Sequence, residues 1–211
     1  MSRRSSLFYS WCLAFLVLPP VLGEVEPAPG FLAVDRLIFE AAAVVGGVVY
    51  SPDGDLIVYD KQSSEVRLYG QGLPRTLAKF ELAPFGSFLI LSPDKTAVIF
   101  GENLSSNIYS IPLSGSGPVL LDNVGLPFDI DFDRDGRGFV SALLAPSNPT
   151  NSIVLLDRDP ASTNRVIVTN IDGVSGPLAL DDHGDLYYGT ADFLRDPQSQ
   201  SLVRFTRDQV L

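Results

Sequence analysis

Ser51-Pro52-Asp53-Gly54 is a turn sequence between two short apolar segments, residues 47–50 and 55–60. Proline fixes φ at the second position of a tight turn, and Asp-Gly supplies side-chain capping and a residue that accepts positive φ. Three further turns of this kind, each between two apolar segments, begin at Ser92, Asp133 and Asp181. The turn starts at residues 51, 92, 133 and 181 are therefore 41, 41 and 48 residues apart.

Each turn lies within a repeated unit of short apolar strands. A period of about 40 residues with several strands in each unit is typical of the blades of a β-propeller. The sequence therefore predicts an all-β propeller with about four recognisable blades, at about residues 44–82, 83–124, 125–172 and 173–211. A β-sandwich of short strands is the alternative, but it does not require this regular spacing. The predicted strands are residues 47–50, 55–60, 65–70 and 75–80 in the first unit, 87–91, 96–101, 107–113 and 118–122 in the second, 127–132, 138–144, 152–157 and 165–170 in the third, and 177–180, 185–190 and 201–206 in the fourth.

Two stretches resemble the repeats of a known group of propellers: residues 51–60, SPDGDLIVYD, and residues 176–188, GPLALDDHGDLYY. They are similar to repeats of the NHL and gluconolactonase/regucalcin-like propeller superfamily, and the resemblance covers about residues 44–211. Enzymes and non-enzymes share such repeats, so the resemblance implies the fold more directly than the function. Members usually close with six blades, so we expect a truncated propeller, or a ring completed by a second copy or by an unusual closure. Truncation is favoured because an incomplete last blade leaves an unpaired apolar edge, which soluble proteins avoid.

The first 23 residues predict a secretory signal peptide. Two arginines precede an apolar run at residues 7–18, and Val21 and Gly23 fit the small-residue rule for cleavage after Gly23. The run of about 12 residues is shorter than the roughly 20 needed to span a bilayer, so no membrane span is expected in the mature chain. Residues 24–43 are predicted to be a linker and N-terminal segment. The protein is therefore expected to be secreted, periplasmic or at the cell surface.

The charge of the chain argues against a nucleic-acid partner. The formal net charge is −10, and removal of residues 1–23, which hold two arginines and no acids, makes it −12. An acidic surface repels phosphate backbones and anionic lipid, and no Lys/Arg cluster interrupts the acidity. The only cysteine, Cys12, lies in the signal segment, so the domain is expected to fold on its apolar core without disulfides.

The sharpest candidate for a metal site is Asp131-Phe132-Asp133-Arg134-Asp135-Gly136. Carboxylates at alternate positions followed by glycine at the sixth resemble the first half of a calcium-binding loop. The second half lacks its carboxylates, because Phe139 and Ala142 stand at the ninth and twelfth positions. One hypothesis is therefore Ca²⁺ bound by Asp131, Asp133 and Asp135, and the other is an Asp-rich hairpin turn. No other cofactor is expected.

The resemblance also implies an enzymatic alternative, a metal-assisted hydrolase that acts on a sugar lactone or ester. In the similar enzymes, metal ligands lie in an Asn-Gly or Asp-Gly pair just before an apolar strand, and no unit of this sequence keeps that pair. Asp129 is one place away from it, and Glu40 is a single candidate for an N-terminal ligand. His183 is the only histidine and lies in a turn, and the chain has no Gly-x-Ser-x-Gly motif, so no catalytic residue is assigned.

The predicted ligand face is the side of the propeller opposite the four turns, where connections between units lie. Asp129 is a further candidate because it shares a strand face with Asp131, where carboxylates can bind a cation or a sugar hydroxyl, although a solvated strand end is the simpler interpretation. We therefore expect an exported, non-catalytic binding module for a protein or carbohydrate ligand at the cell envelope. The other polar residues of this face are Asp60, Lys61, Glu102, Asn103, Asn148, Asn151, Asp192 and Arg195.

Overall fold

The computed structural model describes residues 45–81, 86–144, 150–156, 163–171, 176–190 and 201–211. All of these residues belong to one compact unit, Ile38–Leu211. The predicted signal peptide and the predicted segment at residues 24–43 lie outside the described residues. Within the described part of the chain, no helix is long and apolar enough to cross a membrane.

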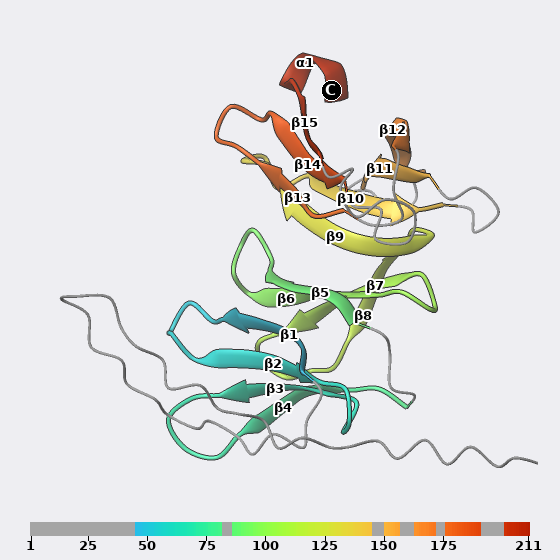
Figure 1. Ribbon diagram of the computed structural model, residues 1–211. Coiled ribbons are helices and arrows are strands. Elements are labelled where there is room, and N and C mark those ends of the chain that lie inside the picture. Colours follow the sequence, from blue (N-terminus) through green and yellow to red (C-terminus); the bar gives the residue numbers. More distant parts are fainter. Residues whose placement is uncertain (1–44, 82–85, 145–149, 157–162, 172–175, 191–200) are drawn as a thin grey trace, which may run out of the picture. The chain divides into compact units, whose positions relative to one another are not determined.

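Four antiparallel sheets follow one another along the chain, and each is built from consecutive strands (Figure 1). The all-β prediction is confirmed, because the ends of every predicted strand lie within two residues of those of an observed strand. The first sheet contains β1 (Val45–Tyr50), β2 (Leu56–Asp60), β3 (Glu65–Tyr69) and β4 (Arg75–Lys79), and the second contains β5 (Gly86–Leu91), β6 (Ala97–Glu102), β7 (Asn107–Pro112) and β8 (Val119–Asn123). The third contains β9 (Leu126–Phe132), β10 (Gly138–Leu143), β11 (Asn151–Leu155) and β12 (Arg165–Ile171). The fourth contains, among the described residues, β13 (Leu178–Leu180), β14 (Leu186–Thr190) and β15 (Ser201–Phe205), and the short helix α1 (Arg207–Val210) follows it.

The second strand of a sheet is the most buried one. Every residue of β2 and of β6 is buried, and their sequences are LIVYD and AVIFGE. Each of these strands has a hydrogen-bonded strand on both sides. A strand that carries apolar residues on both faces also needs cover on both faces. The sequence pattern of these strands therefore predicts that the sheets stack on one another.

The four predicted turns are observed between the first and second strands of the sheets. In each, the N–H of the fourth residue donates to the carbonyl of the first at 2.8–3.0 Å. The fourth residue has φ between 60° and 85°, the left-handed region in which glycine is favoured. Lys95 is the one fourth residue that is not glycine, and its turn is one residue longer, because Ser92 pairs with Ala97 whereas Ser51 pairs with Asp55.

Buried side chains between consecutive sheets form three apolar clusters. The first cluster joins the first and second sheets and includes Tyr59 and Phe100, whose ring centroids are 4.7 Å apart. The second, around Phe88, joins the second and third sheets. The third joins the third and fourth sheets with α1, and it includes Phe139 and Val210. The sheets thus pack in chain order, and their first strands contact one another in the order β1, β5, β9, β13.

Candidate functional site

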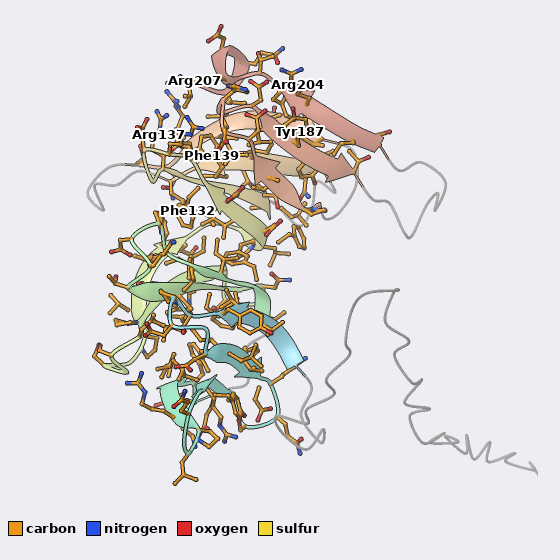
Figure 2. All side chains as sticks on the ribbon, turned by 90° about the vertical axis from the view of Figure 1, so that its left-hand side faces the viewer. Phe132, Arg137, Phe139, Tyr187, Arg204 and Arg207 are labelled. Atoms are coloured by element: carbon orange, nitrogen blue, oxygen red, sulfur yellow. The ribbon has the colours of Figure 1, made fainter. Side chains whose placement is uncertain are left out.

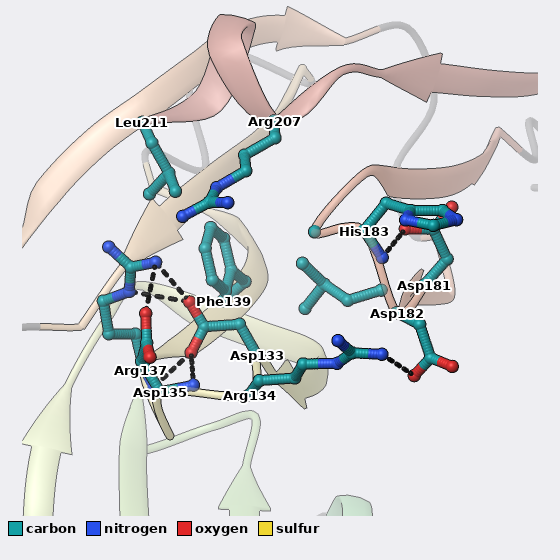
Figure 3. Close-up of a pocket in the computed structure, with 12 residues that line it drawn as sticks. Asp133, Arg134, Asp135, Arg137, Phe139, Asp181, Asp182, His183, Arg207 and Leu211 are labelled. Atoms are coloured by element: carbon teal, nitrogen blue, oxygen red, sulfur yellow. Dashed lines mark hydrogen bonds and ion pairs between the residues drawn. The ribbon is translucent and has the colours of Figure 1, made fainter.

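A polar pocket lies between the turn that joins β9 to β10 and the turn that joins β13 to β14 (Figure 3). Its volume is about 170 Å³, and residues of α1 and of the chain beyond it complete the wall. Figure 2 shows Arg137, Phe139 and Arg207 in the part of the molecule formed by the third and fourth sheets. The lining residues are Asp133, Arg134, Asp135, Arg137, Phe139, Leu180, Asp181, Asp182, His183, Gly184, Arg207 and Leu211.

The first wall of the pocket is a turn held by Arg137. Its Nε and Nη2 atoms each lie 2.6 Å from Asp133 Oδ2, and Nη2 also lies 3.3 Å from Asp135 Oδ2. The other oxygen of Asp133 accepts the backbone N–H groups of Asp135 at 3.0 Å and of Arg137 at 2.8 Å. The Asp133 side chain is only 8% exposed, so these charge-assisted hydrogen bonds are shielded from water and fix both side chains.

The second wall is the turn that begins at Asp181. Asp181 Oδ1 accepts the backbone N–H groups of His183 at 2.8 Å and of Asp185 at 3.0 Å, and Oδ2 accepts the Tyr187 hydroxyl at 3.3 Å. Desolvation acts to raise the pKa of Asp181, but the hydrogen bonds from Asp185 and His183 outweigh it and hold the pKa below its ordinary value. Asp181 is therefore an ionised carboxylate that organises its own turn.

One ion pair joins the two walls. Arg134 Nη2 lies 3.2 Å from Asp182 Oδ1. The two side chains are 71% and 86% exposed, so a pair of this kind is worth about 0–1 kcal/mol. The pair orients the rim of the pocket but adds little to stability.

Arg207 forms the third side of the pocket. Its backbone N–H donates to Asp185 Oδ1 at 2.9 Å, while Asp185 Oδ2 accepts Arg204 Nε at 2.8 Å. The hydrogen bond from Arg204, followed by that from Arg207, lowers the pKa of Asp185. The Arg207 side chain passes close to Gly184, where a Cβ would lie 3.3 Å from Arg207 Cδ. Its guanidinium has no hydrogen-bond or ion-pair partner among the described residues, and Figure 3 shows it directed into the pocket.

Asp129 and Asp131 lie on β9 and reach across to the fourth sheet. Asp129 Oδ2 accepts the Leu178 N–H at 2.9 Å, and Asp131 Oδ2 accepts the Leu180 N–H at 2.7 Å. Burial raises the pKa of Asp129, against the hydrogen bonds from Leu178 and Ile130, and the charge of Asp131 adds a smaller increase. The strand face that these two acids share is therefore a contact between sheets.

The structure does not gather the three predicted calcium ligands around one point. Asp131 bonds to β13, whereas Asp133 and Asp135 contact Arg137. Among the residues that the structure describes, no group of three or more His, Cys, Asp or Glu side chains is arranged to hold a metal ion. Calcium at this turn stays a prediction, and the ion would compete with Arg137 for the same oxygens.

Two residues of the predicted ligand face cap their own loops. Asp60 and Glu102 end β2 and β6 and are 8% and 4% exposed. Each carboxylate accepts the backbone N–H groups two and three residues further on, at 2.9 and 3.4 Å for Asp60 and at 2.8 and 2.5 Å for Glu102. Burial, and then the charges of Glu102 and Asp60, raise the pKa of Tyr59 to about 12, so the two acids approach the same ring.

The remaining predicted ligand-face residues have different surroundings. Lys61 follows Asp60, and Asn103 has a buried Oδ1 atom that lacks a hydrogen-bond partner in the described structure. Asn151 is completely buried, and its Nδ2 donates to the Tyr188 hydroxyl at 2.5 Å. Asn151 thus belongs to the contact between the third and fourth sheets. Asn148, Asp192 and Arg195 lie outside the described residues.

No family model matches the sequence, and no curated protein matches it. Solved structures do match. A gluconolactonase from Xanthomonas campestris has a TM-score of 0.62 at 15% identity, over 82% of this chain and 62% of that one. The nidogen/laminin complex has a TM-score of 0.58 at 15% identity, over 79% and 66% of the two chains. A catalytically inactive virginiamycin B lyase from Staphylococcus aureus with quinupristin has a TM-score of 0.56 at 14% identity, over 80% and 57%.

The chain has a β-propeller fold. The resemblance to NHL-repeat and gluconolactonase-type propellers is therefore confirmed at the level of the fold. The chain spans 57–66% of the length of these three solved propellers. The neighbours include lactonases, lyases and a protein complex, so a shared fold leaves the function to be argued from the site.

The propeller's pocket uses three arginines that the sequence analysis did not single out as site residues: Arg134, Arg137 and Arg207. A local signal existed for Arg137, because it follows Asp133 by four residues across a tight turn. None existed for Arg207, which reaches the pocket only because α1 packs against the third and fourth blades. The pocket also lies at the turn end of the strands, opposite the predicted ligand face.

Proposed function

We propose that the protein is an exported, non-catalytic propeller module that binds a protein or carbohydrate ligand at the cell envelope. The observation that carries this proposal is the pocket between the turns of the third and fourth blades. Its polar side chains are held in place by hydrogen bonds of Arg137, Asp133 and Asp181. A site with fixed groups loses less conformational entropy on binding, and this favours recognition.

The chemistry of the lining supports binding over catalysis. None of the described residues that line the pocket is a Ser, Thr, Cys or Lys, whose side chains could act as a nucleophile. Each of the four aspartates among the described lining residues accepts a backbone N–H group or pairs with an arginine. His183 is exposed in its turn, and an acyl-transfer site would need a nucleophile beside it.

The solved neighbours support two candidate functions. The nidogen/laminin complex contains a propeller engaged with another protein, which supports the binding module. The gluconolactonase neighbours favour the alternative, a metal-assisted hydrolase that acts on a sugar lactone or ester. The residues described here offer no group of metal ligands for that reaction, so the binding module is the leading proposal.

A screen of defined oligosaccharides and peptides against the full chain tests the proposal. The variant His183→Trp places a bulky ring at the third position of the pocket turn, and we expect it to abolish the binding of any ligand that the wild-type chain retains. Asp53→Trp is the matched control, because Asp53 holds the third position of the equivalent turn in the first blade and does not line the pocket. Circular dichroism establishes that both variants are folded.

Two results would contradict the proposal. One is a ligand that binds the His183→Trp variant as well as it binds the wild-type chain, because its site must then lie elsewhere. The other is hydrolysis of glucono-δ-lactone that is lost with a chelator and restored with a divalent metal, because this supports the metal-assisted enzyme.

A further inference from the structure

Each aspartate among the described lining residues has a hydrogen-bond or ion-pair partner. Asp133 accepts three hydrogen bonds, one from Arg137 Nε and two from backbone N–H groups, and its Oδ2 also lies 2.6 Å from Arg137 Nη2. Asp181 accepts two backbone N–H groups and the Tyr187 hydroxyl. The two remaining acids, Asp135 and Asp182, each pair with an arginine.

The donors of the pocket are not all occupied. The Arg207 guanidinium carries five N–H donors in a planar fork, and no described residue accepts from them. The backbone N–H of Arg207 donates to Asp185, and the side chain passes close to Gly184. These two contacts set the direction in which the guanidinium enters the pocket. Arg207 is therefore the one charged side chain, among the described residues of the lining, that lacks a partner.

We propose that this pocket binds the carboxylate of an acidic side chain, Asp or Glu, from a partner protein; the inference rests on the proposed function and names its ligand. Arg207 binds the carboxylate through two parallel N–H···O hydrogen bonds, the geometry for which its planar fork is suited. Leu180 and Leu211 line the same pocket and contact the methylene groups of the ligand side chain.

A carboxylate fits the pocket better than the other polar ligands do. A sugar hydroxyl is neutral and leaves the charge of Arg207 uncompensated, whereas a carboxylate forms a charge-assisted pair with it. A phosphate dianion carries a second negative charge into a pocket with four aspartates in its lining, and this repulsion opposes binding. The single negative charge of an Asp or Glu side chain neutralises the single positive charge of the Arg207 guanidinium.

The experiment is a titration of the full chain with N-acetyl-glutamate amide and with its neutral isostere, N-acetyl-glutamine amide, followed by NMR chemical shifts. The net charge of −10 repels acidic ligands at long range, so the titration is run at about 0.1 M salt, where the Debye length is about 10 Å. We expect the glutamate amide to bind about five-fold more tightly than the glutamine amide, since an exposed ion pair contributes up to about that factor.

Three variants locate the binding. Arg207→Ala is expected to weaken glutamate-amide binding about five-fold, and Arg207→Lys, which keeps the charge but loses the fork, is expected to recover part of the loss. Arg165→Ala is the matched control, because Arg165 is an exposed arginine on β12 outside the pocket lining, and its binding should equal that of the wild-type chain.

Equal binding of the glutamate and glutamine amides would overturn the inference, and so would tighter binding of inorganic phosphate or wild-type affinity in Arg207→Ala. The failures of the two proposals can be told apart. If a neutral ligand binds the wild-type chain but not the His183→Trp variant, the proposal of a carboxylate ligand is refuted and the pocket is still a binding site. If N-acetyl-glutamate amide binds the His183→Trp variant with wild-type affinity, the proposal that this pocket is the binding site is refuted.

Discussion

Asp131, next to Asp129 on the same strand face, makes the contact between the third and fourth blades more polar than the equivalent contacts between the other blades. The strand registers match Asp131 with Val49 in the first blade and with Ile90 in the second, and both of these are apolar residues that pack between blades. In the third blade the same place carries a carboxylate that accepts an N–H of β13. The seam between the third and fourth blades is therefore partly polar, and hydrogen bonds replace part of the apolar contact.

The pH dependence of stability tests the state of Asp129. Burial raises the pKa of this carboxyl in the folded chain, so between its ordinary value near 3.8 and the higher folded value the folded chain holds more protons than the unfolded chain. The contribution of Asp129 to the free energy of unfolding therefore falls as the pH rises through this window. Asn cannot ionise, so the free energy of unfolding of the Asp129→Asn variant should not show this fall with pH.

The measurement is urea unfolding of both chains at pH 4 and pH 7. We expect the wild-type chain to lose more stability over this interval than Asp129→Asn does. The comparison must be a difference between the two chains, because the lowered pKa values of Asp60, Glu65 and Asp185 make stability rise with pH at the acid end. Asp53→Asn, at an exposed turn position, controls for the loss of a charge, and parallel pH profiles for all three chains would refute the assignment.

The second turn is the element that departs from the repeat. Lys95 has φ of 60° at a position where the other turns have glycine, and its turn is one residue longer than that of the first blade. A side chain with a Cβ in the left-handed region costs about 1 kcal/mol relative to glycine. The hydrogen bonds of Ser92 to both Asp94 and Ala97 support the longer turn.

Lys95→Gly is therefore expected to raise the free energy of unfolding by about 0.5–1 kcal/mol, because it removes this strain. Lys95→Ala keeps the Cβ and should give no such gain, so it is the matched control. Urea unfolding of the three chains measures the effect. An equal gain in the two variants would show that the lysine side chain, and not its backbone conformation, is responsible.

Strands and turns were predictable because their signals are local. Alternating apolar segments and Pro, Asp and Gly at fixed places locate β2 or β6 without knowledge of any other part of the chain. The pocket was not predictable in the same way. It needs two turns 48 residues apart in the sequence and a four-residue helix that no strand pattern indicates.

The predicted ligand face shows the same limit. Asp60 and Glu102 are polar residues at strand ends, and this pattern alone cannot distinguish a ligand contact from a loop cap. The structure makes the distinction through hydrogen bonds to the backbone. Arg207 is the opposite case, because its importance depends on the absence of a partner among the described residues, and a sequence does not show this.

The whole molecule combines an acidic chain with one pocket arginine, Arg207, that has no partner among the described residues. The net charge of −10 repels phosphate-rich partners at long range, while Arg207 attracts a carboxylate at contact distance. The blades supply a rigid frame, and the turns at one end of two blades, together with α1, supply the ligand groups. The central claim is that this turn end is the binding surface.

Amide hydrogen exchange of the full chain, with and without a glutamate-rich hexapeptide, tests that claim most directly. Exchange reports local opening, and a bound ligand slows it where it holds the backbone. We predict slower exchange at residues 133–137, 181–185 and 206–207, and unchanged exchange in the loops at residues 61–64 and 103–106. Slower exchange in those two loops, with no change around the pocket, would contradict the account and would return the ligand site to the opposite face of the propeller.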